Sequence, residues 1–95
     1  METMNQLRAD IVAAGVEMLT KGLVAGTWGN ISVRCSQTGL VAITPSGRSY
    51  TTLTPDDIII VDECGHIHEG RWTPSTELPL HLAVYKARPD VQAVV

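Results

Sequence analysis

Two prolines bracket the stretch whose structure the sequence constrains most tightly. Proline is tolerated in an α-helix only in or near the first turn, and the residue before a proline disfavours helical backbone. Pro79 therefore has to stand near the beginning of a helix, and Pro89 requires that helix to end at Arg88. Apolar residues at helical spacing predict a buried stripe along it: Leu78, Leu82 and Tyr85.

The residues that lead into this helix carry hydroxyl groups and one carboxylate. Ser75 or Thr76 is a suitable N-cap, because a side-chain hydroxyl accepts a hydrogen bond from a free backbone N–H. Glu77 follows in the first turn, where the free N–H groups also attract anions. Two interpretations follow: Glu77 is a favourable charge at a helix N-terminus, or it is an acid/base group beside a bound phosphate.

Composition bounds the class of protein. The 95 residues allow one small domain, and 44% hydrophobic residues with few aromatics predict a globular fold with an aliphatic core. A net charge of −3 argues against nucleic acid, and no run approaches the roughly 20 apolar residues of a membrane span. The polar N-terminal segment does not suit a signal peptide. Cys35 and Cys64 are therefore expected to be free thiols in the cytoplasm.

The order of patterns predicts a layered domain. An amphipathic helix is expected over 5–21, ended by Gly22, with Leu7, Ile11 and Met18 on its buried face and Arg8, Asp10 and Glu17 in solvent. Strands are expected over 31–34, 40–44 and 58–61, with a hairpin return at 66–68. In the first of them Ile31 and Val33 alternate with Ser32 and Arg34, which predicts a half-buried strand with one solvated face. Helix, hairpin-linked strands, helix and strand together indicate an α/β or α+β domain with a largely antiparallel sheet.

Several loops carry small polar residues. Residues 26–30 offer Thr27 and Asn30, and residues 44–47 offer Ser46 and Gly47, either as ordinary turns or as anion donors. Arg48 is expected to be solvated. Thr54 caps a single turn in which Asp56 and Asp57 are structural. His66 and His68 share a strand face, so a metal pair is conceivable there, although a solvated hairpin tip is the favoured interpretation.

Taken together, these motifs resemble one known family. In chain order they are Gly26–Ser32, Thr44–Gly47, Leu53–Ile58, Pro74–Glu77, His81 and Tyr85–Asp90. Each motif is weak alone, but in this order and spacing they resemble the N-terminal half of the class II aldolase/adducin family, with the nearest likeness to its L-fuculose-phosphate aldolase branch. The resemblance extends over essentially the whole sequence.

The resemblance implies a fold, an activity and a site. The fold is a three-layer α/β/α domain around a largely antiparallel sheet, with residues 1–95 as its N-terminal portion, assembled as a homotetramer. The activity is that of a zinc-dependent aldolase, which cleaves a sugar 1-phosphate to dihydroxyacetone phosphate and an aldehyde. The family's acid/base carboxylate, also a candidate zinc ligand, falls on Glu77. Its phosphate-binding positions fall on Thr27, Asn30, Ser46, Gly47, Ser75 and Thr76.

The sequence leaves two questions open, the extent of the protein and the reaction. Residues 91–95 begin a buried strand, and the resemblance implies that a His-x-His zinc pair follows beyond Val95. The sequence is therefore expected to belong to a longer protein, and these residues alone are expected to bind no catalytic zinc and to lack aldolase activity. Other family members leave the reaction open: pentulose-phosphate 4-epimerases, which usually carry Asp in place of Glu77, thiosugar-phosphate dehydratases and non-catalytic adducin-like binding modules.

Overall fold

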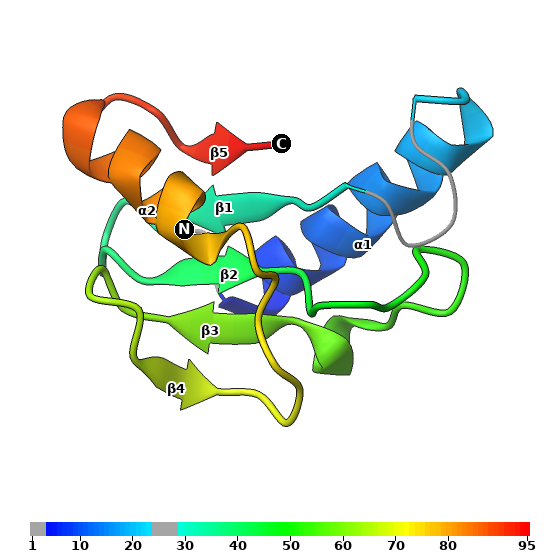
Figure 1. Cartoon of the computed structure of the whole chain (residues 1–95), viewed down its shortest axis with the longest axis horizontal. Helices are drawn as coiled ribbons and strands as arrows, with labels where there is room; N and C mark the ends of the chain where they lie inside the picture. Colours follow the sequence, from blue (N-terminus) through cyan, green and yellow to red (C-terminus); the bar gives the residue numbers. More distant parts are fainter. Residues whose placement is uncertain (1–3, 24–28) are drawn as a thin grey trace.

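A computed structural model describes residues 4–23 and 29–95, and Figure 1 shows how their elements are arranged. The helices are α1 (Met4–Thr20) and α2 (Leu78–Ala87), and a single 3₁₀ turn, η1, spans Pro55–Asp57. The strands are β1 (Ser32–Arg34), β2 (Val41–Ile43), β3 (Ile59–Val61), β4 (Ile67–Glu69) and β5 (Ala93–Val94).

The strands form one antiparallel sheet in the order β4-β3-β2-β1-β5. Hairpins connect β1 to β2 and β3 to β4, whereas β5 returns after α2 to pair with β1 at the other edge. Figure 1 shows α1 behind the sheet and α2 in front of it. The described residues therefore form α/β/α layers, which confirms the predicted fold class.

The core consists of two apolar clusters, one on each face of the sheet. Successive strand residues point to opposite faces, so the continuous apolar run of β3 has to be covered on both sides. Ala42 and Ile60 pack with Ile11 of α1 on one face. On the other face α2 covers the second cluster and contributes Tyr85 to it, and the buried members are Val41, Ile43, Ile59, Val61 and Tyr85.

The structure confirms most of the prediction for the first helix. Leu7 and Ile11 are buried, and Gly22 ends α1 with a φ of 71°. The N–H of Gly22 donates to the Leu19 carbonyl and that of Leu23 to the Met18 carbonyl, the hydrogen-bond pair of a Schellman motif. The prediction for Arg8 was wrong. Its side chain is only 15% exposed and pairs at 3.3 Å with Glu69, the last residue of β4.

The second helix begins one or two residues later than its capping residues suggested. The N-cap is Glu77, without a side-chain cap, rather than Ser75 or Thr76. The Ser75 hydroxyl instead accepts the N–H of Glu77 at 3.2 Å, in the turn that precedes the helix. Pro79 lies in the first turn and Arg88 is the C-cap, as the prolines require.

Strand β1 corrects a second expectation. The alternation of Ile31 and Val33 with Ser32 and Arg34 predicted a strand with one solvated face. Ser32 is instead completely buried, and the Arg34 guanidinium lies 4.7 Å from the centre of the Tyr85 ring. The cause is α2, which covers this face and supplies hydrogen-bond partners for both polar side chains.

Candidate active site

Three loops that are distant in sequence meet at Thr44, just after β2. The Thr44 N–H donates to the Ile31 carbonyl at 3.0 Å, and its hydroxyl accepts the Ile31 N–H at 3.2 Å. The Thr44 carbonyl accepts the N–H of Ser75 at 3.0 Å, and the N–H of Ser46 donates to Thr73 at 2.8 Å. The segments 29–31, 44–47 and 73–77 are therefore neighbours at one end of the sheet.

Five of the six predicted phosphate-binding residues lie on these three segments. Asn30 is partly buried, Ser75 is buried, and Ser46, Gly47 and Thr76 are exposed. Gly47 has a φ of 71°, a backbone conformation that L side chains rarely adopt. Thr27 lies outside the described residues. The fold thus brings small donors together, and their role in phosphate binding stays a prediction.

Glu77 stands at the start of α2 beside the segment that carries Asn30. Its side chain is exposed, and its backbone carbonyl accepts the N–H of His81 at 3.1 Å. A depression of about 360 Å³ opens next to it. The residues that line this depression are Met18, Gly29, Asn30, Glu77, Leu80, His81, Val94 and Val95. A carboxylate and a side-chain amide therefore share one surface cavity with mostly apolar walls.

Beneath this depression, buried side chains form hydrogen bonds that sequence reasoning did not identify as a site. His81 is 1% exposed, and its Nδ1 lies 2.6 Å from the Ser32 hydroxyl. Its Nε2 contacts Asn30 Oδ1, and the Ser32 hydroxyl lies 2.7 Å from the Tyr85 hydroxyl. The available signal was the spacing of His81 and Tyr85, one helical turn apart on the face that meets the sheet.

Burial dominates the electrostatics of His81. Burial lowers its pKa below the ordinary 6.5, and the nearby negative charge of Glu77 opposes that effect. Both ring nitrogens already have partners, Ser32 and Asn30. The ring is therefore a neutral hydrogen-bonding group rather than a free metal ligand.

The described residues do not by themselves fit a catalytic zinc. Within 4–23 and 29–95, no group of three or more His, Cys, Asp or Glu side chains is arranged to hold a metal ion. His66 and His68 instead face Asp62, at 3.4 and 3.1 Å from its carboxylate. Catalytic zinc takes three protein ligands, and Glu77 is the single candidate that the resemblance places here.

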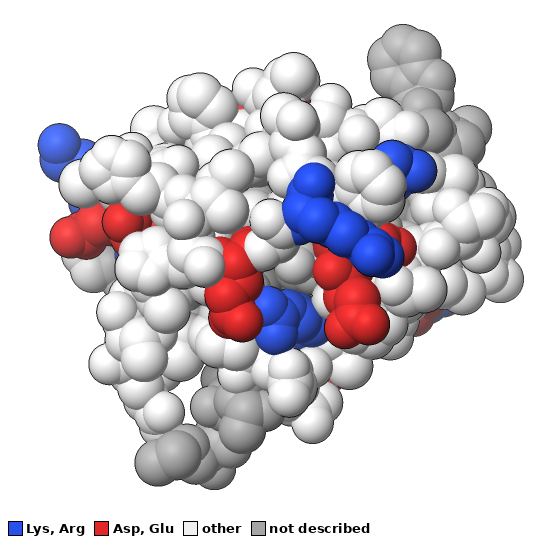
Figure 2. All heavy atoms as spheres, turned by 90° about the horizontal axis from the view of Figure 1, so that it is seen from below, with Lys and Arg blue, Asp and Glu red and all other residues white. Residues whose placement is uncertain are grey.

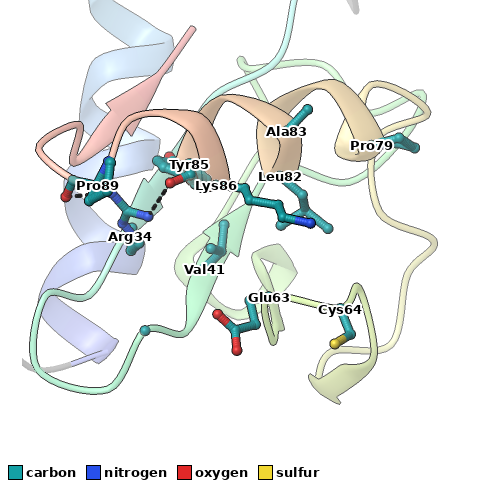
Figure 3. A pocket seen from close by; sticks show the side chains of 11 residues that line it. Arg34, Val41, Glu63, Cys64, Pro79, Leu82, Ala83, Tyr85, Lys86 and Pro89 are labelled. Atoms are coloured by element: carbon teal, nitrogen blue, oxygen red, sulfur yellow. Dashed lines mark hydrogen bonds between the residues drawn. The ribbon is translucent and has the colours of Figure 1, made fainter.

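A larger groove of about 670 Å³ lies along the other side of α2 and does not include Glu77 (Figure 3). Arg34 lies at the C-terminal end of α2, as Figure 3 shows. Its guanidinium donates to the carbonyls of Tyr85, at 2.8 Å, and of Pro89, at 2.9 Å. Because these bonds hold the helix end, Arg34 has a structural role, and we place the chemistry in the smaller depression.

Other surfaces and segments give weaker functional signals. Arg48 is exposed as expected and stacks on Trp72, 3.6 Å from the ring centre. On the face seen in Figure 2, acidic and basic side chains of the described residues lie side by side rather than in a basic patch.

No helix within the described ranges has the length and apolar character to cross a membrane. Cys35 is buried and Cys64 exposed.

The fold and the converging loops agree with what comparison with known proteins shows. Residues 9–95 match the family described as Class II Aldolase and Adducin N-terminal domain, and the chain belongs to this family.

Among curated relatives, the chain is 46% identical over 88 residues to a 5-deoxy-D-ribulose 1-phosphate aldolase of Bacillus thuringiensis serovar kurstaki, covering 93% of this chain and 41% of the relative. It is 40% identical over 92 residues to the L-ribulose-5-phosphate 4-epimerase UlaF of Salmonella typhi, covering 97% of this chain and 40% of the relative. The chain thus spans about two fifths of the length of these relatives.

Solved structures give the same family. An L-fuculose 1-phosphate aldolase superimposes with a TM-score of 0.88 at 34% identity, covering 92% of this chain and 41% of that one. YgbL of Klebsiella pneumoniae, described as a putative aldolase/epimerase/decarboxylase, superimposes with a TM-score of 0.89 at 30% identity, covering 98% of this chain and 44% of that one. These neighbours confirm both the predicted family and the likeness to L-fuculose 1-phosphate aldolase.

Proposed function

We propose that this chain is the N-terminal portion of an enzyme that makes or breaks a carbon–carbon bond in a phosphorylated sugar. The substrate class is a sugar 1-phosphate similar to L-fuculose 1-phosphate. The single observation that carries the proposal is the depression shared by Glu77 and Asn30. Further support comes from the hydrogen bonds of Thr44, which join the donor-bearing segments 29–31, 44–47 and 73–77.

In this proposal Glu77 moves the proton. Cleavage next to a carbonyl passes through an enediolate, whose carbon must gain a proton in one direction and lose it in the other. A carboxylate within hydrogen-bond reach of that carbon carries out both transfers. The exposed side chain of Glu77, at the mouth of the depression, is accessible to a ligand there.

The phosphate is held by neutral donors rather than by a cluster of cations. Asn30, Ser46, Gly47, Ser75 and Thr76 offer amide, hydroxyl and backbone N–H groups, and Thr27 completes the proposed set. Holding the phosphate fixes the distance between the reacting carbon and Glu77, which removes much of the entropic barrier to reaction. This arrangement requires no basic protein, consistent with the net charge of −3.

Zinc, assembly and compartment are further parts of the proposal. Because the described residues do not hold zinc themselves, we propose that Glu77 is at most one ligand and that the others come from outside these 95 residues. The chain alone is therefore expected to bind no stoichiometric zinc, which metal analysis of the purified protein tests. A homotetramer in the cytoplasm completes the proposal.

A second candidate reaction is 4-epimerisation of a pentulose phosphate. The observation that favours it is the 40% identity to an L-ribulose-5-phosphate 4-epimerase. The two reactions share a carbon–carbon cleavage, and an epimerase rejoins the fragments. Family resemblance associates aspartate with the epimerases at this position, so the longer carboxylate of Glu77 favours the aldolase.

A chimera tests the proposed reaction. Residues 9–95 replace the corresponding segment of the Bacillus thuringiensis aldolase, with which the chain shares 46% identity. We expect the chimera to cleave a sugar 1-phosphate and to release dihydroxyacetone phosphate. A folded, metal-loaded chimera that epimerises L-ribulose 5-phosphate without releasing this product would instead establish the second reaction.

Asn30→Ala in the same chimera tests the phosphate pocket. Loss of one hydrogen bond to a charged group should weaken binding of the phosphorylated sugar by about 1.5–3 kcal/mol. Binding of the unphosphorylated sugar should barely change, and Gln37→Ala in the exposed turn between β1 and β2 serves as the control. An equal loss for both ligands would show that Asn30 is structural.

A further inference from the structure

A continuous series of buried hydrogen bonds ends at Asn30, on the wall of the depression. Its members come from three parts of the fold: Tyr85 and His81 on α2, Ser32 on β1, and Asn30 in the preceding loop. We propose that His81 is a positioning residue, which holds the Asn30 amide so that its NH₂ group faces the depression as a fixed anion donor. Only the identity of the anion, a substrate phosphate, rests on the proposed function.

Burial makes these bonds obligatory. Ser32 is 0% exposed, His81 1% and Tyr85 4%, so water does not replace a missing partner. An unpaired buried polar group costs about 1–3 kcal/mol, and the stable arrangement is the one in which every proton in the series has an acceptor. The donor and acceptor roles of the four polar side chains are therefore coupled.

A neutral imidazole donates from one nitrogen and accepts at the other, so the protons in this series of hydrogen bonds can point in one of two orders. In the first, the Tyr85 hydroxyl donates to Ser32, and the Ser32 hydroxyl donates to His81 Nδ1. The protonated Nε2 then donates to Asn30 Oδ1. The side-chain NH₂ of Asn30 is left with both of its protons available on the side of the depression.

The reverse order leaves groups unsatisfied. If Nδ1 donated to Ser32, the Ser32 proton would go to Tyr85, and the Tyr85 proton would have no acceptor among the described residues. The reverse order would also turn the Asn30 carbonyl towards an incoming anion, beside the carboxylate of Glu77.

The first order also suits the charges around the ring. Glu77 lines the same depression as His81, and a donor NH₂ between a carboxylate and an anion reduces their repulsion. Burial favours the neutral ring more strongly than Glu77 favours the charged one. Arg34 stacks on Tyr85, and its guanidinium donates to backbone carbonyls.

The tautomer of His81 in the unmodified protein tests the order of the series directly. With ¹⁵N-labelled histidine, two-bond proton–nitrogen correlations distinguish the two neutral forms and the imidazolium. His66 and His68 are exposed and serve as internal references. We expect His81 to be neutral and protonated at Nε2 at pH 7. Protonation at Nδ1, or at both nitrogens, would overturn the proposal.

Two substitutions separate positioning from packing. The amide of His81→Gln reaches the position of Nε2 and keeps a donor for Asn30, whereas that of His81→Asn reaches only the position of Nδ1. Inorganic phosphate is the probe, and the Asn30 side-chain NH₂ signal reports its binding. We expect His81→Gln to bind within about threefold of the unmodified protein and His81→Asn to lose about tenfold or more.

The outcomes distinguish this inference from the proposed function. Equal losses in both variants, with Asn30 unshifted, would overturn the inference and assign His81 to packing alone. An Nε2–H tautomer without any phosphate response would refute phosphate as the ligand and overturn the anion-donor role of Asn30. Phosphate binding with an Nδ1–H tautomer would refute the positioning role and leave the proposed function standing.

Discussion

Asp57 connects the η1 turn with the segment that carries Arg71 and Trp72, and its substitution is a stringent test of the fold. One carboxylate oxygen accepts the Thr54 N–H at 3.0 Å and the Thr54 hydroxyl at 3.1 Å. The other accepts Trp72 Nε1 at 2.8 Å and lies 3.4 Å from Arg71. Asp57→Asn keeps an acceptor for Trp72 but replaces the oxygen that serves Thr54 with an NH₂ group.

The hydrogen bonds from Trp72 and then Thr54 lower the pKa of Asp57 from 3.8 to about 2. At 1.36 kcal/mol per pKa unit, that difference corresponds to roughly 2.4 kcal/mol, which solvent screening of a partly exposed carboxylate reduces to about 1–2 kcal/mol. Because the folded-state pKa is the lower one, this stability is complete above about pH 4 and is lost as pH falls through 2.

Urea unfolding measures the effect. For a protein of this size the slope is about 1 kcal/mol per molar urea, so the midpoint of Asp57→Asn should fall by about 1–2 M at pH 7. The control is Asp56→Asn, an exposed carboxylate in the same turn, which should change the midpoint little. The gap between Asp57→Asn and the unmodified protein should narrow between pH 4 and pH 2. Equal effects of the two variants, or a gap independent of pH, would refute the reasoning.

Two further predictions concern the core and the thiols. A Cβ at Gly15 would lie 2.8 Å from Tyr50 Cδ1, so Gly15→Ala should destabilise the protein by about 1–2 kcal/mol, despite the better helix propensity of alanine. Thermal unfolding measures it, and a stabilised variant would contradict the close packing of α1 on Tyr50. In the native protein a thiol reagent should modify the exposed Cys64 rapidly and the buried Cys35 only on unfolding. Equal rates at both thiols would contradict the burial of Cys35.

Local rules predicted the elements whose limits are set by neighbours in sequence. Pro79 and Pro89 fixed the limits of α2 because proline acts on its own backbone and on the preceding residue. Asp57 and Thr54 lie three residues apart, so the turn that they form could also be predicted from the sequence. The order of these elements, with the family resemblance, was sufficient for the layered antiparallel fold.

The errors at Arg8 and Ser32 involve partners that are distant in sequence, whereas the error at the N-cap of α2 is a shift of one or two residues along the chain. Arg8 was assigned to solvent because its ion-pair partner, Glu69, belongs to β4, an edge strand that lies far from α1 in sequence. Ser32 was assigned to a solvated face because nothing near it in sequence reveals that Tyr85 and His81 will cover it. Within the candidate site, the donor loops could be predicted from the sequence as motifs of small residues. The buried hydrogen bonds beneath Asn30 could be found only from the three-dimensional structure, because they join residues of β1 and α2.

Hydrogen exchange at the substrate carbon tests the role of Glu77 most directly. In the chimera with the Bacillus thuringiensis aldolase, solvent deuterium should enter dihydroxyacetone phosphate without any aldehyde present. Glu77→Gln keeps the size of the side chain but removes its capacity for proton transfer, so exchange and cleavage should both fall by at least about 10²-fold. Phosphate affinity should stay unchanged, and the metal content of the variant is measured because Glu77 is also a candidate zinc ligand. Near-normal exchange in this folded, metal-loaded variant would contradict the assignment of Glu77 as the acid/base group.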